Sequence, residues 1–315
     1  MVSQRGPEHS AGRYPESVSI REVGPRDGLQ NEAPVPIEVR VALIDALSAT
    51  GLSRIEAASF VSAAAIPPMV GAAQVMASIT RRAGVRYSAL VPNLRGARDA
   101  IAARADDIQV VVSASETHNQ KNVRRSVAES LQGVYEIVEA AAAAGVPVEG
   151  IVSTAFGCPY EGDVAPERVA QLAGHLLDAG CAALSFGDTT GMATPGRVDA
   201  LCDALGSARV DITAIGLHFH DTRGTALANV LTGLACGVTR YDASIGGLGG
   251  CPYAPGASGN LVTEDLVHML HDMGIATGVD LDALLGCARL AREIVGRDLP
   301  SALLRAGPRT RLAAS

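Results

Sequence analysis

Short apolar runs rich in β-branched residues alternate with longer, alanine-rich stretches through almost the whole chain. The apolar runs are typical of buried β-strands and occupy residues 18–23, 54–57, 86–91, 108–113, 146–153, 183–186, 214–218 and 240–245. Helices are expected between them at 37–50, 69–83, 94–105, 123–144, 166–179, 195–205, 225–236 and 263–273, with a further helix at 281–295. Eight such units, about 30 residues apart, predict an α/β fold, a (β/α)8 TIM barrel with an extra C-terminal helix. A doubly wound parallel sheet is the alternative.

Length and composition are those of one large domain. The chain has 315 residues, 48% of them hydrophobic, so a single barrel is expected over 17–300, with tails at 1–16 and 301–315. A net charge of −7 and the absence of tryptophan argue against a nucleic-acid partner. No apolar run is long enough for a membrane span, no secretory signal is evident, and the six cysteines show no CxxC spacing. We therefore expect a cytoplasmic protein with reduced thiols and no membrane partner.

Two histidines, His218 and His220, lie one residue apart at the end of the strand expected at 214–218. Side chains two positions apart on a strand point to the same face, so both imidazoles can bind one cation. Such a pair also occurs as ordinary hydrogen-bonded core residues. Asp27, which follows the first expected strand beside Arg26, adds a carboxylate. Two imidazole nitrogens and a carboxylate oxygen suit Mg²⁺, Mn²⁺ or Zn²⁺.

Further polar residues gather where the expected strands end, which is the edge that carries the active site in TIM barrels. Glu56 lies on the second expected strand, Asn93 follows the third, and Asp188 follows the sixth. Any one of them alone is equally well explained as a helix cap or a turn residue. Together with Arg26, Asp27 and the two histidines they indicate a site.

A glycine-rich segment, residues 246–260, follows the last expected strand, and six of its fifteen residues are glycine. This composition indicates unusual backbone angles, close approach to a ligand or motion, with a plain linker as the alternative. The segment contains Cys251 and ends at Asn260. The word GCPY occurs here at 250–253 and also at 157–160, so spacing alone does not tell whether Cys251 or Cys158 is chemical.

These residues carry a resemblance to a known family. The chain resembles 3-hydroxy-3-methylglutaryl-CoA (HMG-CoA) lyases over residues 18–295. The matching words are EVGPRDGLQNE at 22–32, IE at 55–56, SFVS at 59–62, PNL at 92–94, GCPYEG at 157–162, GDT at 187–189, HFHDT at 218–222 and the segment 247–260. The last is highly specific, whereas RDG and HxH alone indicate only the wider superfamily of metal-dependent lyases and condensing enzymes.

The resemblance implies retro-Claisen cleavage of HMG-CoA to acetyl-CoA and acetoacetate, with an acyl-CoA as the substrate. It implies a divalent cation, Mg²⁺ or Mn²⁺, bound by Asp27, His218, His220 and Asn260. The implied catalytic residues are Arg26, Cys251, Glu56, Asp188 and His218. Arg26 is expected against the thioester carbonyl and Cys251 in proton transfer, whereas Cys158 is expected to be structural. Substrate contacts are expected from Arg26, Gln30, Asn93, Lys121 and Arg223.

Some positions depart from the family pattern. Arg223-Gly224-Thr225 stands in place of Tyr-Gly-Gln, residues 63–67 lack the usual Pro-Lys-Trp-Val-Pro, and Ala33 replaces a lysine. Cleavage of a related 3-hydroxyacyl-CoA therefore stays open. The candidates for binding the phosphates of CoA are Arg95, Lys121, Arg124 and Arg125, and each is equally well explained as an ordinary solvated charge on a helix.

Two competing functions remain. A condensing enzyme of the isopropylmalate or homocitrate synthase type usually has a further C-terminal region, which is not expected here, and the GGCPY word at 249–253 favours a lyase. A catalytically inactive scaffold barrel is disfavoured because the metal set and Arg26 are intact. If the protein forms an oligomer, a homodimer is expected.

Overall fold

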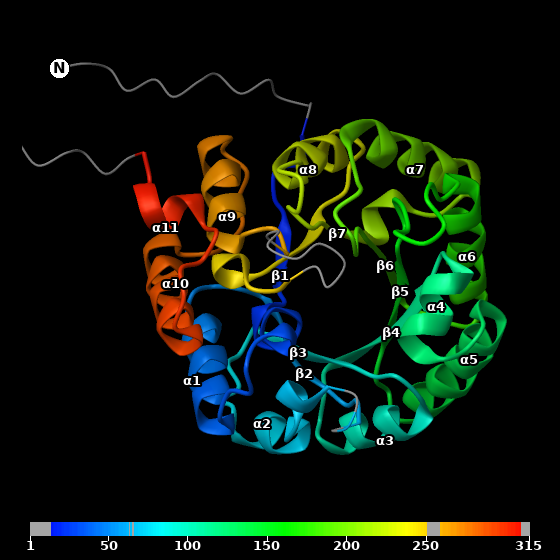
Figure 1. Ribbon diagram of the computed structural model, residues 1–315, viewed down its shortest axis with the longest axis horizontal. Helices are drawn as coiled ribbons and strands as arrows, with labels where there is room; N and C mark the ends of the chain where they lie inside the picture. Colours follow the sequence, from blue (N-terminus) through cyan, green and yellow to red (C-terminus); the bar gives the residue numbers. More distant parts are fainter. Residues whose placement is uncertain (1–13, 63, 65, 251–258, 310–315) are drawn as a thin grey trace, which may run out of the picture.

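The barrel predicted from the sequence is present in the computed structural model, which describes residues 14–62, 64, 66–250 and 259–309. Within this part of the chain eight parallel strands close in the order β1-β2-β3-β4-β5-β6-β7-β8 (Figure 1). They are β1 (Ser19–Glu22), β2 (Arg54–Ser59), β3 (Arg86–Leu90), β4 (Asp107–Ser113), β5 (Val148–Ser153), β6 (Ala183–Gly187), β7 (Ile215–His218) and β8 (Arg240–Ala243). Pairing of β8 with β1 closes the sheet, so the TIM barrel is confirmed and the doubly wound alternative is wrong.

Helices form a ring around the barrel (Figure 1). They are α1 (Ile37–Ser48), α2 (Ala72–Ser78), α3 (Leu94–Ala102), α4 (Glu116–Val123), α5 (Val127–Ala143), α6 (Pro166–Asp178), α7 (Pro195–Ser207), α8 (Ala226–Ala235), α9 (Thr263–Asp272), α10 (Leu281–Val295) and α11 (Ala302–Ala306). Short 3₁₀ or π turns are η1 (Gly24–Gly28), η2 (Leu29–Asn31), η3 (Pro67–Met69), η4 (Ile212–Ala214) and η5 (Ile245–Gly247). None of the described helices is long and apolar enough to span a membrane.

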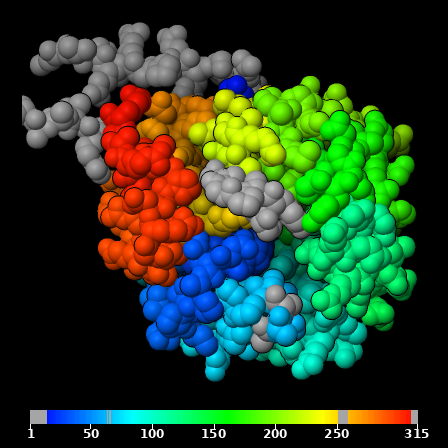
Figure 2. All heavy atoms as spheres, in the orientation of Figure 1, coloured from blue at the N-terminus to red at the C-terminus, as the bar shows by residue number. Residues whose placement is uncertain are grey.

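The first and last parts of the chain pack together at the outside of the barrel. Helix α1 buries Leu43, Ile44 and Leu47 completely, because this spacing places them on one helical face. Burial of such a side chain stabilises the fold by about 1.5–3 kcal/mol. α1 also contacts α10, and Figure 2 shows the blue and the red-orange segments adjoining on this face. The helices are thus in contact between α1 and α10, as the strands are paired between β1 and β8.

The helix expected at 123–144 corresponds to α5, which begins four residues later at Val127, and it is preceded by a separate helix, α4, that was not expected. Arg124 ends α4 in the left-handed conformation, with φ 57°, and Ser126 begins α5. Ser126 and Glu129 form a reciprocal capping box, in which each side chain accepts from the other residue's amide. The S-x-x-E pattern is a recognised helix-start signal, so this boundary was readable from sequence. A further difference is at 301–315, expected as tail, where residues 302–306 form α11.

Candidate metal centre and active site

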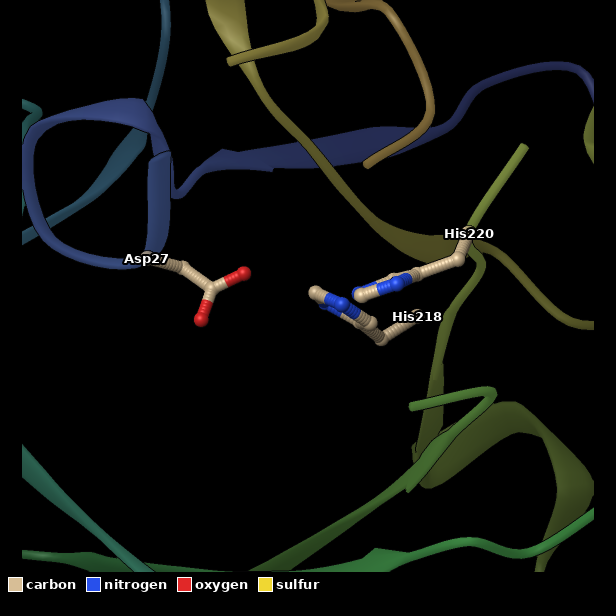
Figure 3. A group of neighbouring side chains, drawn as sticks. All are labelled: Asp27, His218 and His220. Carbon is tan, nitrogen blue, oxygen red and sulfur yellow. The ribbon is translucent and has the colours of Figure 1, made fainter. Parts of the chain in front are cut away.

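Asp27, His218 and His220 meet at the C-terminal mouth of the barrel. Figure 3 shows the carboxylate of Asp27 and the two imidazole rings pointing toward one another. One ligand atom from each residue lies within 4.8 Å of the others, and among the described residues this trio alone forms a cluster of this kind. The two imidazole rings are 5.2 Å apart between centroids. The structure thus brings together the three residues that the sequence placed at one edge of the barrel.

The local backbone after β1 explains the position of Asp27. In η1, a π-helical turn, the amides of Asp27 and Gly28 both donate to the carbonyl of Val23, at 2.7 and 3.2 Å. π turns insert one extra residue and are frequent at functional sites. The turn presents two adjacent side chains to the same pocket, where Arg26 Nη1 donates to Asp27 Oδ1 at 2.7 Å.

Asn260 joins this cluster although it lies 233 residues from Asp27 in sequence. It forms a β-bridge with His220, which extends the end of β7. Its side-chain nitrogen donates to Asp27 Oδ2 at 2.8 Å and to the carbonyl of Leu248 at 3.0 Å. Its Oδ1 is buried without a hydrogen-bond partner. Gly249 leaves the space for this amide, since a Cβ there would lie 2.6 Å from the amide nitrogen.

Burial and neighbouring charges shift the pKa values of the cluster. Burial opposes protonation of His218, but hydrogen bonding and charge from Asp242 outweigh it and raise the pKa of His218. Burial, followed by the neighbouring His218, lowers the pKa of His220 to about 3. For Asp27 burial acts to raise the pKa, but Arg26 and the two histidines outweigh it and hold the pKa below its usual value. The shifts favour an ionised Asp27 and a neutral His220, which are the states that metal coordination requires.

These four side chains fit a divalent cation. Oxygen atoms from Asp27 and Asn260 and nitrogens from two histidines form a mixed N/O set that suits Mn²⁺, Mg²⁺ or Zn²⁺. Two buried polar atoms that lack a partner, Asn260 Oδ1 and His220 Nδ1, belong to this set. A buried polar atom without a partner is costly, so these two atoms are more easily explained as groups for a ligand.

Arg26 lies beside the cluster between two carboxylates. Its Nη1 donates to Asp27 and its Nη2 donates to Glu56 Oε2 at 2.7 Å. Gln30 Nε2 donates to the same Asp27 oxygen at 2.8 Å. This hydrogen bond also helps to hold the carboxylate of Asp27, a candidate metal ligand, in place. Burial raises the pKa of Glu56, even though Arg26 and Arg21 pull it down. A fixed guanidinium is therefore held next to the candidate metal site.

Asp188 lies where β6 ends and its amide donates to the carbonyl of His218 at 2.8 Å. Its Oδ1 accepts from the amides of Met192 and Ala193 at 2.7 and 3.0 Å, whereas Oδ2 is buried without a partner. Burial raises the pKa of Asp188 to about 6, against the effect of these two hydrogen bonds. This carboxyl group can exchange a proton near neutral pH.

The other predicted substrate residues lie on loops or helices at the same rim and are exposed. Asn93 Oδ1 accepts from a backbone amide at 3.0 Å and caps α3. The Lys121 ammonium lies 4.8 Å from the ring centroid of Tyr160. Arg223 donates to two backbone carbonyls of the loop after β6, at 2.9 and 2.7 Å. Their contact with substrate stays a prediction.

The two GCPY words differ in what the structure describes. Cys251 lies outside the described residues. Cys158 is buried, 1% exposed, and its thiol donates to Ser115 Oγ at 3.0 Å, which agrees with a packing role. None of the cysteines in the described part of the chain forms a disulfide bond.

A group of charged residues in the barrel interior was not predicted from the sequence. Arg21 of β1, Glu149 of β5 and Asp242 of β8 are buried and joined by ion pairs, and Asp242 also contacts His218. The sequence does contain a signal for this group, because the strands expected at 18–23, 146–153 and 240–245 each include one of these charged residues. A charge in a strand with both faces covered must find a partner.

Comparison with known proteins agrees with the fold and the site. The HMGL-like family matches residues 17–291. Hydroxymethylglutaryl-CoA lyase YngG of Bacillus subtilis is 50% identical over 290 residues, which cover 91% of this chain and 96% of that protein.

Solved structures agree as well. The crystal structure of the B. subtilis HMG-CoA lyase has a TM-score of 0.91 and 49% identity, and the match covers 93% of this chain and 98% of that one. An HMG-CoA lyase from Acinetobacter baumannii, solved with coenzyme A and 3-methylmalate, has a TM-score of 0.91, 44% identity and coverage of 95% and 98%. The family match and this degree of identity leave one conclusion: the chain belongs to the HMGL-like family, the family of the HMG-CoA lyases.

Proposed function

We propose that this protein is a hydroxymethylglutaryl-CoA lyase, a carbon–carbon lyase that cleaves HMG-CoA to acetyl-CoA and acetoacetate. The observation that carries the proposal is the convergence of Asp27, His218 and His220 next to the fixed guanidinium of Arg26. The similarity to lyases of this name over nine-tenths of the chain supports it. It also disfavours the two alternatives, a condensing enzyme and an inactive scaffold.

The reaction sets three tasks for the pocket. The 3-hydroxyl proton must leave, the C2–C3 bond breaks, and its electron pair passes to the thioester carbonyl to give the enolate of acetyl-CoA. The enolate carbon then takes up a proton. A divalent cation at Asp27, His218, His220 and Asn260 would lower the pKa of a coordinated hydroxyl.

Arg26 is assigned to the developing enolate oxygen. Its guanidinium is held by Asp27 and Glu56, so the charge is fixed in place before the substrate arrives. Preorganised donors of this kind stabilise an oxyanion more than a mobile charge does, because they need no reorganisation during the reaction.

Proton transfer is assigned to two groups. Asp188 has a buried carboxyl oxygen without a partner and a pKa of about 6, which suits acceptance of a proton near neutral pH. Cys251 is assigned to protonation of the enolate carbon, as the sequence predicts. The glycine-rich segment that contains it is proposed to exclude water from the reacting centre.

The finer identities are also part of the proposal. We assign Mg²⁺ or Mn²⁺ as the cation because half of the donor set is oxygen. The coenzyme A bound to the Acinetobacter relative supports an acyl-CoA substrate here. Gln30, Asn93, Lys121 and Arg223 remain the proposed substrate contacts. A cytoplasmic location and a homodimer stay predictions from the sequence.

The proposal is tested by incubating metal-stripped protein with a panel of 3-hydroxyacyl-CoAs, with and without added Mg²⁺ or Mn²⁺, and identifying products by mass spectrometry. We expect acetyl-CoA and acetoacetate from HMG-CoA only when a cation is present. Full activity without a cation would refute the metal site. Activity confined to another 3-hydroxyacyl-CoA would refute the substrate while leaving the lyase chemistry intact.

A further inference from the structure

Directly below the candidate metal centre, three neighbouring strands place polar side chains in one layer of the barrel. In the strand register His218 of β7 is paired with Asp242 of β8, and Asp242 is paired with Arg21 of β1. The three side chains are in contact as well. Asp242 Oδ2 lies 3.3 Å from His218 Nδ1, and Arg21 donates to both carboxylate oxygens of Asp242 from Nε and Nη2, at 2.8 and 2.7 Å.

The chain of contacts continues across the barrel. Arg21 Nη1 forms an ion pair with Glu149 of β5, which lies on the far side of the sheet. Glu149 is in turn contacted by Arg240 and, at 3.6 Å, by Arg54. The side chains of Arg21 and Glu149 are each 3% exposed and that of Asp242 is 9% exposed, so all three are shielded from water.

This arrangement decides which nitrogen of His218 is available above it. An ionised carboxylate only accepts hydrogen bonds, and the two-pronged Arg21 contact keeps Asp242 ionised and oriented. Asp242 therefore requires a proton on Nδ1 of His218. In the neutral imidazole this leaves the lone pair on Nε2, the nitrogen on the side away from Asp242.

We propose that Asp242, held by the Arg21–Glu149 pair, is a positioning residue that fixes the Nδ1–H tautomer and the ring orientation of His218 for metal binding. The inference rests on the metal site of the proposed function. It gives the buried charged residues Arg21, Glu149 and Asp242 a role in metal binding, although none of them is proposed as a ligand of the cation. Carboxylates that orient a histidine ligand in this way commonly change metal affinity by about 10–100-fold when they are removed.

Asp242→Asn provides the test, because the amide preserves the volume and reverses the polarity. The amide oxygen of the variant is expected to replace Oδ1 and accept from Arg21 Nε, whereas the NH₂ group replaces Oδ2 and gives up the contact with Arg21 Nη2. Its NH₂ group then faces His218 Nδ1 and favours the opposite tautomer, with the proton on Nε2. The wrong tautomer places a hydrogen where the metal should bind.

Asp107→Asn is the matched control. Asp107 is a buried carboxylate in the same charged region, and its described partners are Arg86 at 3.1 Å, Gln109 at 2.8 Å and Arg54 at 3.7 Å. It has no described contact with His218. Both variants thus neutralise one buried carboxylate beside arginines, and they differ in contact with the histidine.

Mn²⁺ affinity is measured by titration of the metal-stripped, full-length proteins, with the unfolding midpoint recorded for each. We expect Asp242→Asn to weaken Mn²⁺ binding by about 10–100-fold and Asp107→Asn to change it less than about threefold. Equal affinity of the wild type and Asp242→Asn, or an equal loss in both variants, would overturn the inference. Failure of the wild type itself to bind Mn²⁺ would instead overturn the metal site of the proposed function.

A second measurement does not depend on the folding of any Asp242 variant. The tautomer of His218 is read from ¹⁵N–¹H correlation spectra of metal-stripped wild-type protein labelled at histidine, at alkaline pH where imidazoles are neutral. The signal is assigned by its loss in His218→Gln. The Nδ1–H pattern is the expected result, and an Nε2–H pattern would refute the proposed role of Asp242.

Discussion

Replacement of Arg26 with lysine retains a positive charge but removes the planar fork. In the native protein the two terminal nitrogens of Arg26 engage Asp27 and Glu56 at 2.7 Å each, and Glu56 is only 1% exposed. A single ammonium group cannot hold both carboxylates in this geometry and also face an enolate oxygen. The variant therefore loses a fixed oxyanion donor while the pocket keeps its overall charge.

The expected loss is in kcat. Removal of one preorganised oxyanion donor costs about 3 kcal/mol of transition-state stabilisation, or about 10²-fold in rate. Steady-state kinetics with HMG-CoA should show kcat lowered by about this factor and KM changed much less. The matched control is Arg81→Lys, an equivalent change in the Arg81–Asp106 ion pair, which lies outside the pocket. A rise in KM with unchanged kcat would show that Arg26 only anchors the substrate and would refute the assigned role.

Three further predictions address the metal, the buried carboxyl groups and the thiols. His220→Ala should abolish Mn²⁺ binding in a metal titration. His175 is exposed, and the control variant His175→Ala should bind Mn²⁺ like the wild type. Retained binding in His220→Ala would contradict the assignment of His220 as a ligand. Burial raises the pKa of Glu22 to about 7, so the stability that its neutral form supplies is present at acidic pH and is lost as the pH rises through about 7. Urea unfolding should show that the free energy of unfolding of the wild type falls by up to about 3 kcal/mol relative to that of Glu22→Gln between about pH 5 and pH 8. If the free energies of unfolding of the two proteins change with pH in parallel, this effect is excluded. Brief iodoacetamide treatment should label Cys251 before the buried Cys158, with protection by substrate, as peptide mass spectrometry would reveal; faster labelling of Cys158 would reverse the assignment of the chemical thiol.

Local signals explain why much of the fold was predictable. Helix α10 was expected at 281–295, and the structure has these same bounds. Asp280 caps its first turn and Gly296 ends it with φ 66°, so both boundaries depend on neighbouring residues alone. The start of α5 was expected at 123 instead of 127, because the helix was placed without using the Ser126 capping signal. That error lay in the interpretation of the sequence, since the signal is local.

The candidate site was predictable to the extent that barrel topology determines it. All parallel strands end at one mouth of a barrel, so Asp27 after β1 and His218 at the end of β7 were expected to meet. The convergence of these side chains with His220 agrees with that expectation. The link between Asn260 and Asp27 came from the resemblance, because two residues 233 positions apart leave no periodic pattern.

The amino-acid sequence by itself determined the alternation of strands and helices, the helix caps and the set of polar residues at the strand ends, because each depends on residues close together in the chain. Only the tertiary structure decided how the interior charges are paired. Arg21 bonds Asp242, 221 residues away, and Glu149, 128 residues away. Alternation along a strand indicates which residues share a face, but the register and closure of the barrel decide which of them meet across it. The contact of Asp242 with His218 therefore depends on barrel closure, a physical constraint that acts between strands and not within them.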